Sequence, residues 1–487
     1  MRKLCILLAA AAPLGAQQAP PVRLIDLPTA QTKPVIGNAS AVRALPGGRL
    51  LVNDIQKRQL LMFDQSLANF TVVADSVSGG TNAYGRSQGG IIPYFADSTL
   101  FIDPGDLSMF VIDPNGTISR VAAVPRSQDA MMLGSNMLGS PGLDSKGRIV
   151  YRGSPTRLMP APSKDGKGFG IPELPDSGAI VRVDLTTRKI DTAAFYKISK
   201  TKMNVVQNEK GMTMMSEINP MQTLDDWAVT DDGTIAIIRG RDYHIDWVDA
   251  DNHVTSTGKI PFEWQRLSDE DKVAVIDSAK AAMEAARAKM AAGGPGGPVV
   301  AGGGGPIMIT SFSVGGGGGS GDAGTARRGA ETAIGGMGMS PLNFVAPSEL
   351  PDYRPAIGAG AAKPDMDGNL WIRTSATRKG AVAGPIYDVV NRKGELVDRV
   401  QIPSGRQIIG FGKGGVVFML ARDDKGAWIE RTTAGPKTRS LQGLGPEVRG
   451  RPSKAGRLFS FPPRPSPSGG GRNITLTIRF ATLPLTV

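Results

Sequence analysis

Arginine, asparagine and aspartate recur where short apolar strands end along this sequence. The six strand ends that share this feature carry Asn53 with Asp54, Asp103, Arg152, Arg239, Arg373 and Arg422. An arginine guanidinium donates two parallel hydrogen bonds to a carboxylate or a phosphate. The four arginines therefore predict contacts to an anionic ligand, and the amide and two carboxylates would supply polar groups between them. In the alternative, each arginine pairs with an acid of a neighbouring repeat and only stabilises the fold.

These strand ends belong to a unit that repeats along the chain. Its clearest copy, Lys363 to Arg373, is a polar Asp/Gly turn followed by Leu370, Trp371 and Ile372. Asp, Asn and Gly suit a tight turn, and large or β-branched apolar residues suit a buried strand. Five further copies keep this order, with turns near residues 48, 98, 147, 233 and 415.

The spacing of the copies predicts the fold class. A period of about 50 residues is typical of propellers and solenoids. Each copy is followed by a second apolar segment that ends with a polar turn, so each repeat predicts two hairpins, which make one four-stranded antiparallel blade. We therefore predict an all-β protein, a six-bladed β-propeller over residues 22–436. We expect Val22 to Leu27 to complete the last blade.

An insertion at residues 265–347 follows the fourth blade. Ser268 and the acidic residues after it predict the start of a helix over residues 268–290. We expect the apolar stripe of this helix to pack across a blade face, and its members are Val273, Ile276, Ala279, Met283, Ala286 and Met290. The glycine-rich sequence after the helix is too poor in side chains to form a core. We expect it to be flexible, with one short strand within residues 307–314.

Residues 1–16 have the features of a secretory signal. Arg2 and Lys3 precede an apolar run, and small residues lead to a cleavage position after Ala16. The single cysteine, Cys5, lies inside this segment, so the mature chain would hold no disulfide. We expect a periplasmic or extracellular protein without a membrane span.

The net charge of +12 is concentrated near the C-terminus. Residues 437–487 hold nine basic residues and one acid, Glu447, so the predicted propeller itself is close to neutral. We expect this Pro/Gly/Ser-rich tail to be disordered, and we expect no nucleic-acid partner. The alternative is that its basic and aromatic residues bind a polyanion.

Six such repeats, an Asp365-Met366-Asp367-Gly368-Asn369 turn before Leu-Trp and a signal sequence resemble the six-bladed β-propellers of the NHL and TolB-like group. The resemblance covers residues 22–436, and the helical insertion is similar to that of a bacterial subgroup of exported proteins. It implies the fold and leaves the activity open, because this architecture serves scaffolds, receptors, lactonases and lyases.

The resemblance also implies one enzymatic alternative. Lactonase-like propellers hold a divalent ion such as Ca²⁺ with Glu, Asn and Asp oxygens from separate blades. Asn53, Asp54 and Asp103 could supply such oxygens here, whereas arginine, which repels a cation, stands at the other four strand ends. The primary prediction is therefore no metal and no cofactor, and a metal-dependent hydrolase is the alternative.

The sequence favours a binding module over an enzyme. It indicates no catalytic residue, because neither His244 nor His253 has an identifiable serine or carboxylate partner. We expect an exported, monomeric propeller that binds an anionic small molecule or a protein partner at one mouth of its channel. A scaffold without any small ligand is the third interpretation.

Overall fold

The computed structural model describes residues 19–77, 83–154, 175–199, 202–208, 211–291, 311–314, 343–376, 384–424 and 426–434. The predicted signal at residues 1–16 and the predicted tail at 437–487 lie outside the described residues. The same holds for the glycine-rich segment, apart from residues 311–314 and 343–347.

Six four-stranded antiparallel blades form the ring of a β-propeller, which confirms the predicted fold class. Blades 1 to 3 consist of β3 (Ala39–Ala44), β4 (Leu50–Asp54), β5 (Gln59–Phe63) and β6 (Phe70–Asp75); β7 (Gly90–Pro93), β8 (Thr99–Asp103), β9 (Ser108–Ile112) and β10 (Ile118–Ala123); and β11 (Gly142–Leu143), β12 (Ile149–Arg152), β13 (Ser177–Val183) and β14 (Ile190–Lys197).

Blades 4 to 6 follow the same order along the chain. Their strands are β17 (Asp226–Val229), β18 (Ile235–Arg239), β19 (His244–Val248) and β20 (Val254–Ser256); β22 (Ile357–Pro364), β23 (Leu370–Thr374), β24 (Ile386–Val390) and β25 (Leu396–Gln401); and β26 (Arg406–Gly412), β27 (Val416–Asp423) and β28 (Gly426–Thr433) with one strand from the N-terminus.

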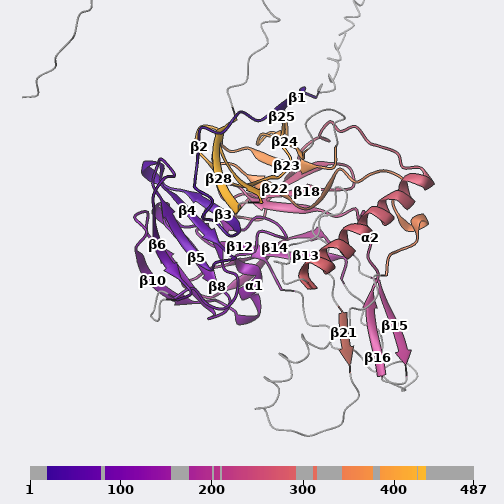
Figure 1. Cartoon of the computed structure of the whole chain (residues 1–487), viewed down its shortest axis with the longest axis horizontal. Coiled ribbons are helices and arrows are strands. Elements are labelled where there is room, and N and C mark those ends of the chain that lie inside the picture. Colours follow the sequence, from indigo (N-terminus) through magenta and orange to yellow (C-terminus); the bar gives the residue numbers. More distant parts are fainter. Residues whose placement is uncertain are drawn as a thin grey trace, which may run out of the picture. The chain divides into compact units, whose positions relative to one another are not determined.

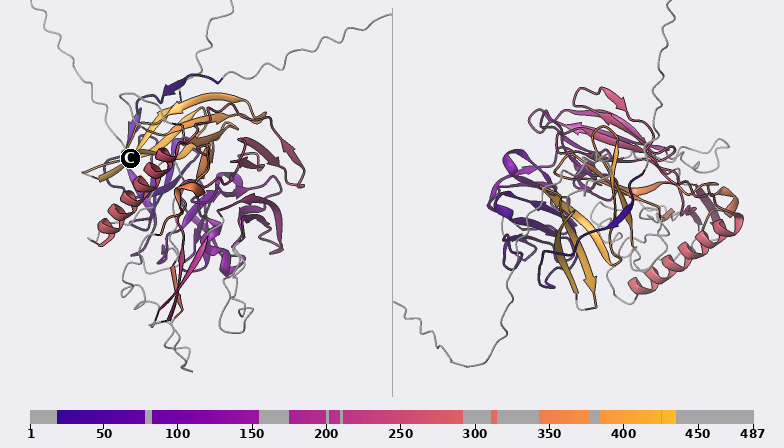
Figure 2. Two further views of the ribbon diagram at one scale, coloured as in Figure 1. Left: turned by 90° about the vertical axis from the view of Figure 1, so that its right-hand side faces the viewer. Right: turned by 90° about the horizontal axis from the view of Figure 1, so that it is seen from above.

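The hydrophobic core is divided among the blade boundaries. Six clusters of buried apolar side chains each join two neighbouring blades, so every blade is buried on both faces. The first strands of successive blades contact one another, which places them nearest the axis of the ring. Figure 1 shows the strands of blades 1 and 2 packed together, and Figure 2 shows the yellow strands of blade 6 beside the indigo strands of blade 1.

The repeated turn has a simple hydrogen-bonded form. In the turn before β23, Asp365 Oδ1 accepts the backbone N–H groups of Asp367 at 2.9 Å and Asn369 at 2.7 Å. Gly368 adopts a φ of 80°, which side chains other than glycine rarely tolerate. Asp144 makes the corresponding bonds before β12. The Asp and Gly of the repeat are thus required by the turn itself.

The closing strand differs from the prediction. The outer strand of blade 6 is β2 (Ala30–Gln31), which pairs antiparallel with β28. The predicted segment supplies β1 (Val22–Leu24), which instead adds in parallel to the outer edge of blade 5. Arg23 and Asp398 fix this position with an ion pair of 2.7 Å. The N-terminal segment therefore ties blades 5 and 6 together.

The inserted helix forms where it was predicted but packs differently. Helix α2 (Asp269–Ala291) starts after Ser268, whose hydroxyl accepts the N–H of Asp271 at 3.1 Å. Ala279 and Met283 are buried, whereas Val273 of the predicted stripe is 45% exposed. The apolar cluster beside the helix comprises Met221, Leu267, Val345 and Leu350, which lie in connections between blades and not on a blade face.

The connection between blades 3 and 4 contains a hairpin. Strands β15 (Met203–Asn208) and β16 (Gly211–Ser216) pair with β21 (Ser311–Val314), which confirms the short strand expected in the insertion. Figures 1 and 2 show this small sheet extending away from the blades. Helix α1 (Ala130–Leu133) precedes β11. Among the described residues, no helix is long and apolar enough to span a membrane.

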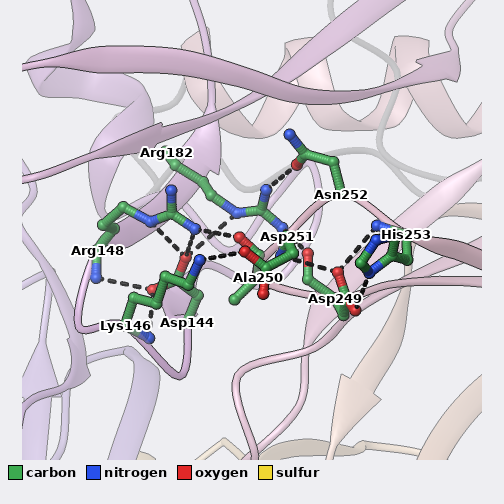
Figure 3. A network of polar contacts seen from close by, with 9 residues as sticks. All are labelled: Asp144, Lys146, Arg148, Arg182, Asp249, Ala250, Asp251, Asn252 and His253. Carbon is green, nitrogen blue, oxygen red and sulfur yellow. Dashed lines mark hydrogen bonds and ion pairs between the residues drawn. The ribbon is translucent and has the colours of Figure 1, made fainter.

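A buried polar network joins the turns of blades 3 and 4 (Figure 3). Arg182, which is 1% exposed, donates to Asn252 Oδ1 and to the carbonyl of Asp249. Its Nε lies 3.3 Å from Asp144 Oδ2, an oxygen that also accepts from Arg148 Nε at 2.7 Å. Burial lowers the pKa of Arg182, so the surrounding acceptors must offset the cost of the buried charge.

Replacing Arg182 tests this network. Arg182→Met leaves two acceptors of blade 4 without their donor, and breaking one side of such a buried ionic network costs about 3–5 kcal/mol. Urea denaturation should show a loss of this size. The control is Lys146→Met, which removes a half-exposed ion pair to Asp251 in the same network and should cost less than about 1 kcal/mol. Equal losses for the two variants would contradict the structural role of Arg182.

Candidate anion-binding site

The predicted strand-end residues fall into two groups that face opposite neighbours. Successive residues of a strand point to opposite faces, so a shift of one position reverses the face. Three residues directly precede the four-residue turn to the third strand and face the preceding blade; they are Asp54, Asp103 and Arg239. The others share the face of side chains packed on the following blade, and they are Asn53, Arg152, Arg373 and Arg422.

The two carboxylates of the first group hold the chain that enters their blades. Asp54 accepts the N–H groups of Gly37 at 2.7 Å and Asn38 at 3.0 Å. Asp103 accepts the N–H of Gly85 at 2.6 Å. Both side chains are fully buried. These oxygens are therefore engaged by backbone donors of the connections between blades.

Asn53 contacts the connection that Asp103 holds, and Arg422 contacts the connection that Asp54 holds. Asn53 Nδ2 donates to the carbonyl of Gly89 at 2.8 Å, and its Oδ1 accepts the hydroxyl of Tyr84 at 3.0 Å. The exposed Arg422 reaches the Gly37 carbonyl and Asn38 Oδ1, each at 3.3 Å. The structure thus groups Asn53 with Asp103 and Arg422 with Asp54, at separate boundaries of the ring.

Arg239 forms ion pairs within the protein. Its guanidinium lies 2.8 Å from Asp225 Oδ2 and 2.7 Å from Asp246 Oδ2. Both acids belong to the same repeat as Arg239, whereas the alternative predicted an acid of a neighbouring repeat. His244 lies between Asp242 Oδ1 at 2.7 Å and Asp246 Oδ1 at 3.3 Å, so this histidine does have carboxylate partners that the sequence did not indicate.

The residues of the metal alternative do not fit a divalent cation. Asn53, Asp54 and Asp103 already accept hydrogen bonds from protein donors, and Asp54 lies at a different boundary of the ring from the other two. Across the part of the chain that the structure describes, no group of three or more His, Cys, Asp or Glu side chains could hold a metal ion. We derive no reaction step through a metal here.

Arg373 lies beside a second cation, Lys363, on blade 5. Lys363 opposes Trp371 on the neighbouring strand, so Arg373 is its diagonal neighbour on the same face. Burial, together with the neighbouring charge of Arg373, lowers the pKa of Lys363 to about 8. Both side chains are half-buried, and no hydrogen bond or ion pair joins either one to a described residue. The acid that acts on Lys363 is Asp226, which forms no ion pair with it.

The buried Asp226 lies on the neighbouring blade, on strand β17. Its Oδ2 accepts the N–H of Ala362 at 2.7 Å, and the carboxyl is 2% exposed. Burial raises the pKa of Asp226 to about 6, because the low dielectric disfavours the charged form. The negative charge of Asp226 raises the pKa of Lys363, but by less than burial lowers it.

Comparisons with known proteins give no functional assignment. No family model matches the chain, and no curated protein does. Among solved structures, a streptogramin B lyase is 10% identical, with 83% of this chain and 96% of that chain covered and a TM-score of 0.34. A catalytically inactive virginiamycin B lyase from Staphylococcus aureus with quinupristin is 9% identical, with 83% and 98% covered and a TM-score of 0.33.

A third similar structure is a gluconolactonase from Xanthomonas campestris. It is 13% identical, with 51% of this chain and 91% of that chain covered and a TM-score of 0.24. Likenesses this distant carry no argument about activity. The assignment of the fold rests on the sheet topology of the chain itself.

The carboxyl of Asp226 predicts a pH dependence of stability. Its pKa is 3.8 when unperturbed and about 6 in the folded chain, so folded protein binds the proton more strongly and stability falls as pH rises between these values. Between about pH 4.5 and pH 7.5 this group alone should cost about 2 kcal/mol. In urea titrations, Asp226→Asn should remove that part of the pH dependence, and the half-exposed control Asp191→Asn should not. An unchanged dependence in Asp226→Asn would contradict the assigned pKa.

Proposed function

We propose that this chain is an exported binding module of the NHL and TolB-like group, and that Lys363 and Arg373 hold its anionic ligand. The single observation that carries the proposal is a pair of neighbouring, half-buried cations that form no ion pair with a described acid. Two like charges side by side destabilise each other, and an anion between them reverses the sign of that interaction. The proposed export rests on the sequence of residues 1–16.

The surroundings of the pair suit a fixed binding position. Trp371 packs against Tyr387 and Phe411, with ring centroids 6.2 and 5.2 Å apart, so the strands that carry the two cations are held rigidly. Tyr387 is paired with Arg373 across β23 and β24. A guanidinium offers a planar fork and an ammonium a compact charge, which together suit a carboxylate or a phosphate group.

The other predicted residues have different parts in this proposal. Arg152 and Arg422 form no ion pair with a described carboxylate and remain candidates for further anion contacts. Arg239 is engaged by two acids and contributes to the fold. Asn53, Asp54 and Asp103 position the connections between blades, so their contribution to ligand binding would be indirect. The anion is a small molecule or a group presented by a protein partner.

The test is anion binding by the mature chain. Isothermal titration with citrate and with inorganic phosphate should detect binding to the wild type, and Lys363→Met with Arg373→Gln should weaken it at least about tenfold, because two charge-assisted contacts are lost. The control, Arg120→Gln with Lys189→Met, removes the same charge from exposed positions of blades 2 and 3 and should bind normally.

Stability provides a second measurement on the same variants. Without ligand, the Lys363→Met and Arg373→Gln variant should be as stable as the wild type or more stable, since it removes a repulsive and partly buried pair. A marked loss of stability would indicate an internal partner for these cations. No binding of either anion by the wild type, at low ionic strength, would leave the scaffold interpretation.

A further inference from the structure

Two blades of the ring close their first hairpin with a three-residue turn that ends in two glycines. The blade 1 turn, Pro46–Gly48, joins β3 to β4, and the blade 6 turn, residues 413–415, joins β26 to β27. The glycines have a positive φ in both turns, 75° and 73° in blade 1 and 72° and 73° in blade 6. Few other residues tolerate such a backbone. The two turns therefore present the same backbone groups to their surroundings.

The blade 6 turn already holds a carboxylate. Asp367, in the corresponding turn of blade 5, accepts the N–H of Gly414 with Oδ1 at 2.9 Å and the N–H of Gly415 with Oδ2 at 2.6 Å. Successive backbone N–H groups in such a turn form an anion-binding concavity. The protein itself thus shows which chemical group this turn accepts from the preceding blade.

The blade 1 turn receives no carboxylate from its own preceding blade, which is blade 6. Asp367 is the middle residue of the turn of blade 5, and the middle residue of the blade 6 turn is Gly414. Glycine has no side chain with which to reach the next turn. Among the described residues, no acid accepts a hydrogen bond from the N–H of Gly47 or Gly48.

The blade 1 turn is open to a molecule from solution. Pro46, Gly47 and Gly48 are exposed, and a Cβ added at Gly47 would meet no atom within 4 Å. Blade 6 is adjacent at this point, because a Cβ added at Gly412 would lie 3.6 Å from the Cβ of Ala44. A carboxylate can therefore approach the two N–H groups from the surface, and no cavity in the core is needed.

The charges around the blade 1 turn favour an anion. Arg49 Nε donates to the carbonyl of the first turn residue at 3.3 Å, so its guanidinium lies against the turn. Arg431 of blade 6 donates to the carbonyl of Gln65 at 2.8 Å, and the side chain of Gln65 lies beside Gly48. Neither arginine forms an ion pair with a described acid. Asp64, next to Gln65 in the sequence, accepts hydrogen bonds within its own turn.

We infer that the blade 1 turn is a binding position for a carboxylate group of a molecule from solution, held by the two glycine N–H groups and by the charges of Arg49 and Arg431. A carboxylate offers one oxygen to each N–H group, as Asp367 does in blade 6, and it can also accept charge-assisted hydrogen bonds from arginine. The inference goes beyond the proposed function and uses neither cation of blade 5, so either site can fail without the other.

Backbone NMR observes the two donors directly. In ¹H–¹⁵N spectra of the full chain at constant ionic strength, titration with acetate should move the resonances of Gly47 and Gly48 downfield, because their N–H groups gain a charged acceptor. Gly415, whose N–H is bonded to Asp367, should stay in place. Shifts no larger than that of Gly405, an exposed glycine with a φ of 78° outside any such pair, would overturn the inference.

Emptying the blade 6 turn provides the matched control. Asp367→Ala removes the internal carboxylate, so acetate should then shift Gly414 and Gly415 as it shifts the glycines of blade 1. A response in the blade 6 turn alone would overturn the inference, because it would show that the blade 1 turn lacks something that binding requires. No response in either turn would overturn it as well.

The contribution of charge is tested with a double variant. Arg49→Gln with Arg431→Gln should weaken the acetate response of the blade 1 turn about threefold or more, because two surface charges are lost. The control, Arg120→Gln with Lys189→Met, removes the same charge from exposed positions of blades 2 and 3 and should respond normally. The variant without the two cations of blade 5 should also respond normally. An equal loss in the control would overturn the assigned role of the two arginines.

Discussion

Every blade of this ring is buried on both faces, and that constraint determines which hydrogen-bond or ion-pair partners are open to each polar side chain at a strand end. Where such a side chain is buried, it must find its partner in its own or a neighbouring blade, in a connection between blades, or in a bound molecule. Asp54 and Asp103 find backbone N–H groups, and Arg239 finds two acids. Arg373 and Lys363 form no ion pair with a described acid, which makes them the candidates for ligand binding.

The fold could be predicted from the sequence because its local chemistry repeats. The Asp and Gly of each turn are needed for hydrogen bonds and for a positive φ, so they mark the blades wherever they occur. The closing strand could not be placed in the same way. Val22 to Leu24 and Ala30–Gln31 are both short, and only the pairing in three dimensions shows that the first joins blade 5 and the second blade 6.

The candidate site could be predicted only in part from the sequence. A shift of one residue along a strand turns a side chain to the opposite face of the blade, and the predicted residues differ by such shifts. Asn53 and Asp54 are adjacent in sequence yet contact different boundaries of the ring. Arg239 and Arg373 likewise end equivalent strands but face opposite neighbours. Lys363 was overlooked as a member of the site, although a lysine within an innermost strand is a polar interruption that could have drawn attention to it.

The ammonium group of Lys363 offers the most direct test of the account. Its pKa can be followed by NMR of ¹³C-methylated lysines in the full chain, with Lys363→Arg to identify the signal. The account predicts titration near 8 without ligand, below the 10.5 of an unperturbed lysine, and a rise toward that value when citrate is bound. Titration near 10.5 without ligand, or a pKa that saturating citrate does not change, would contradict the proposal that Lys363 has no ion-pair partner and binds an anion.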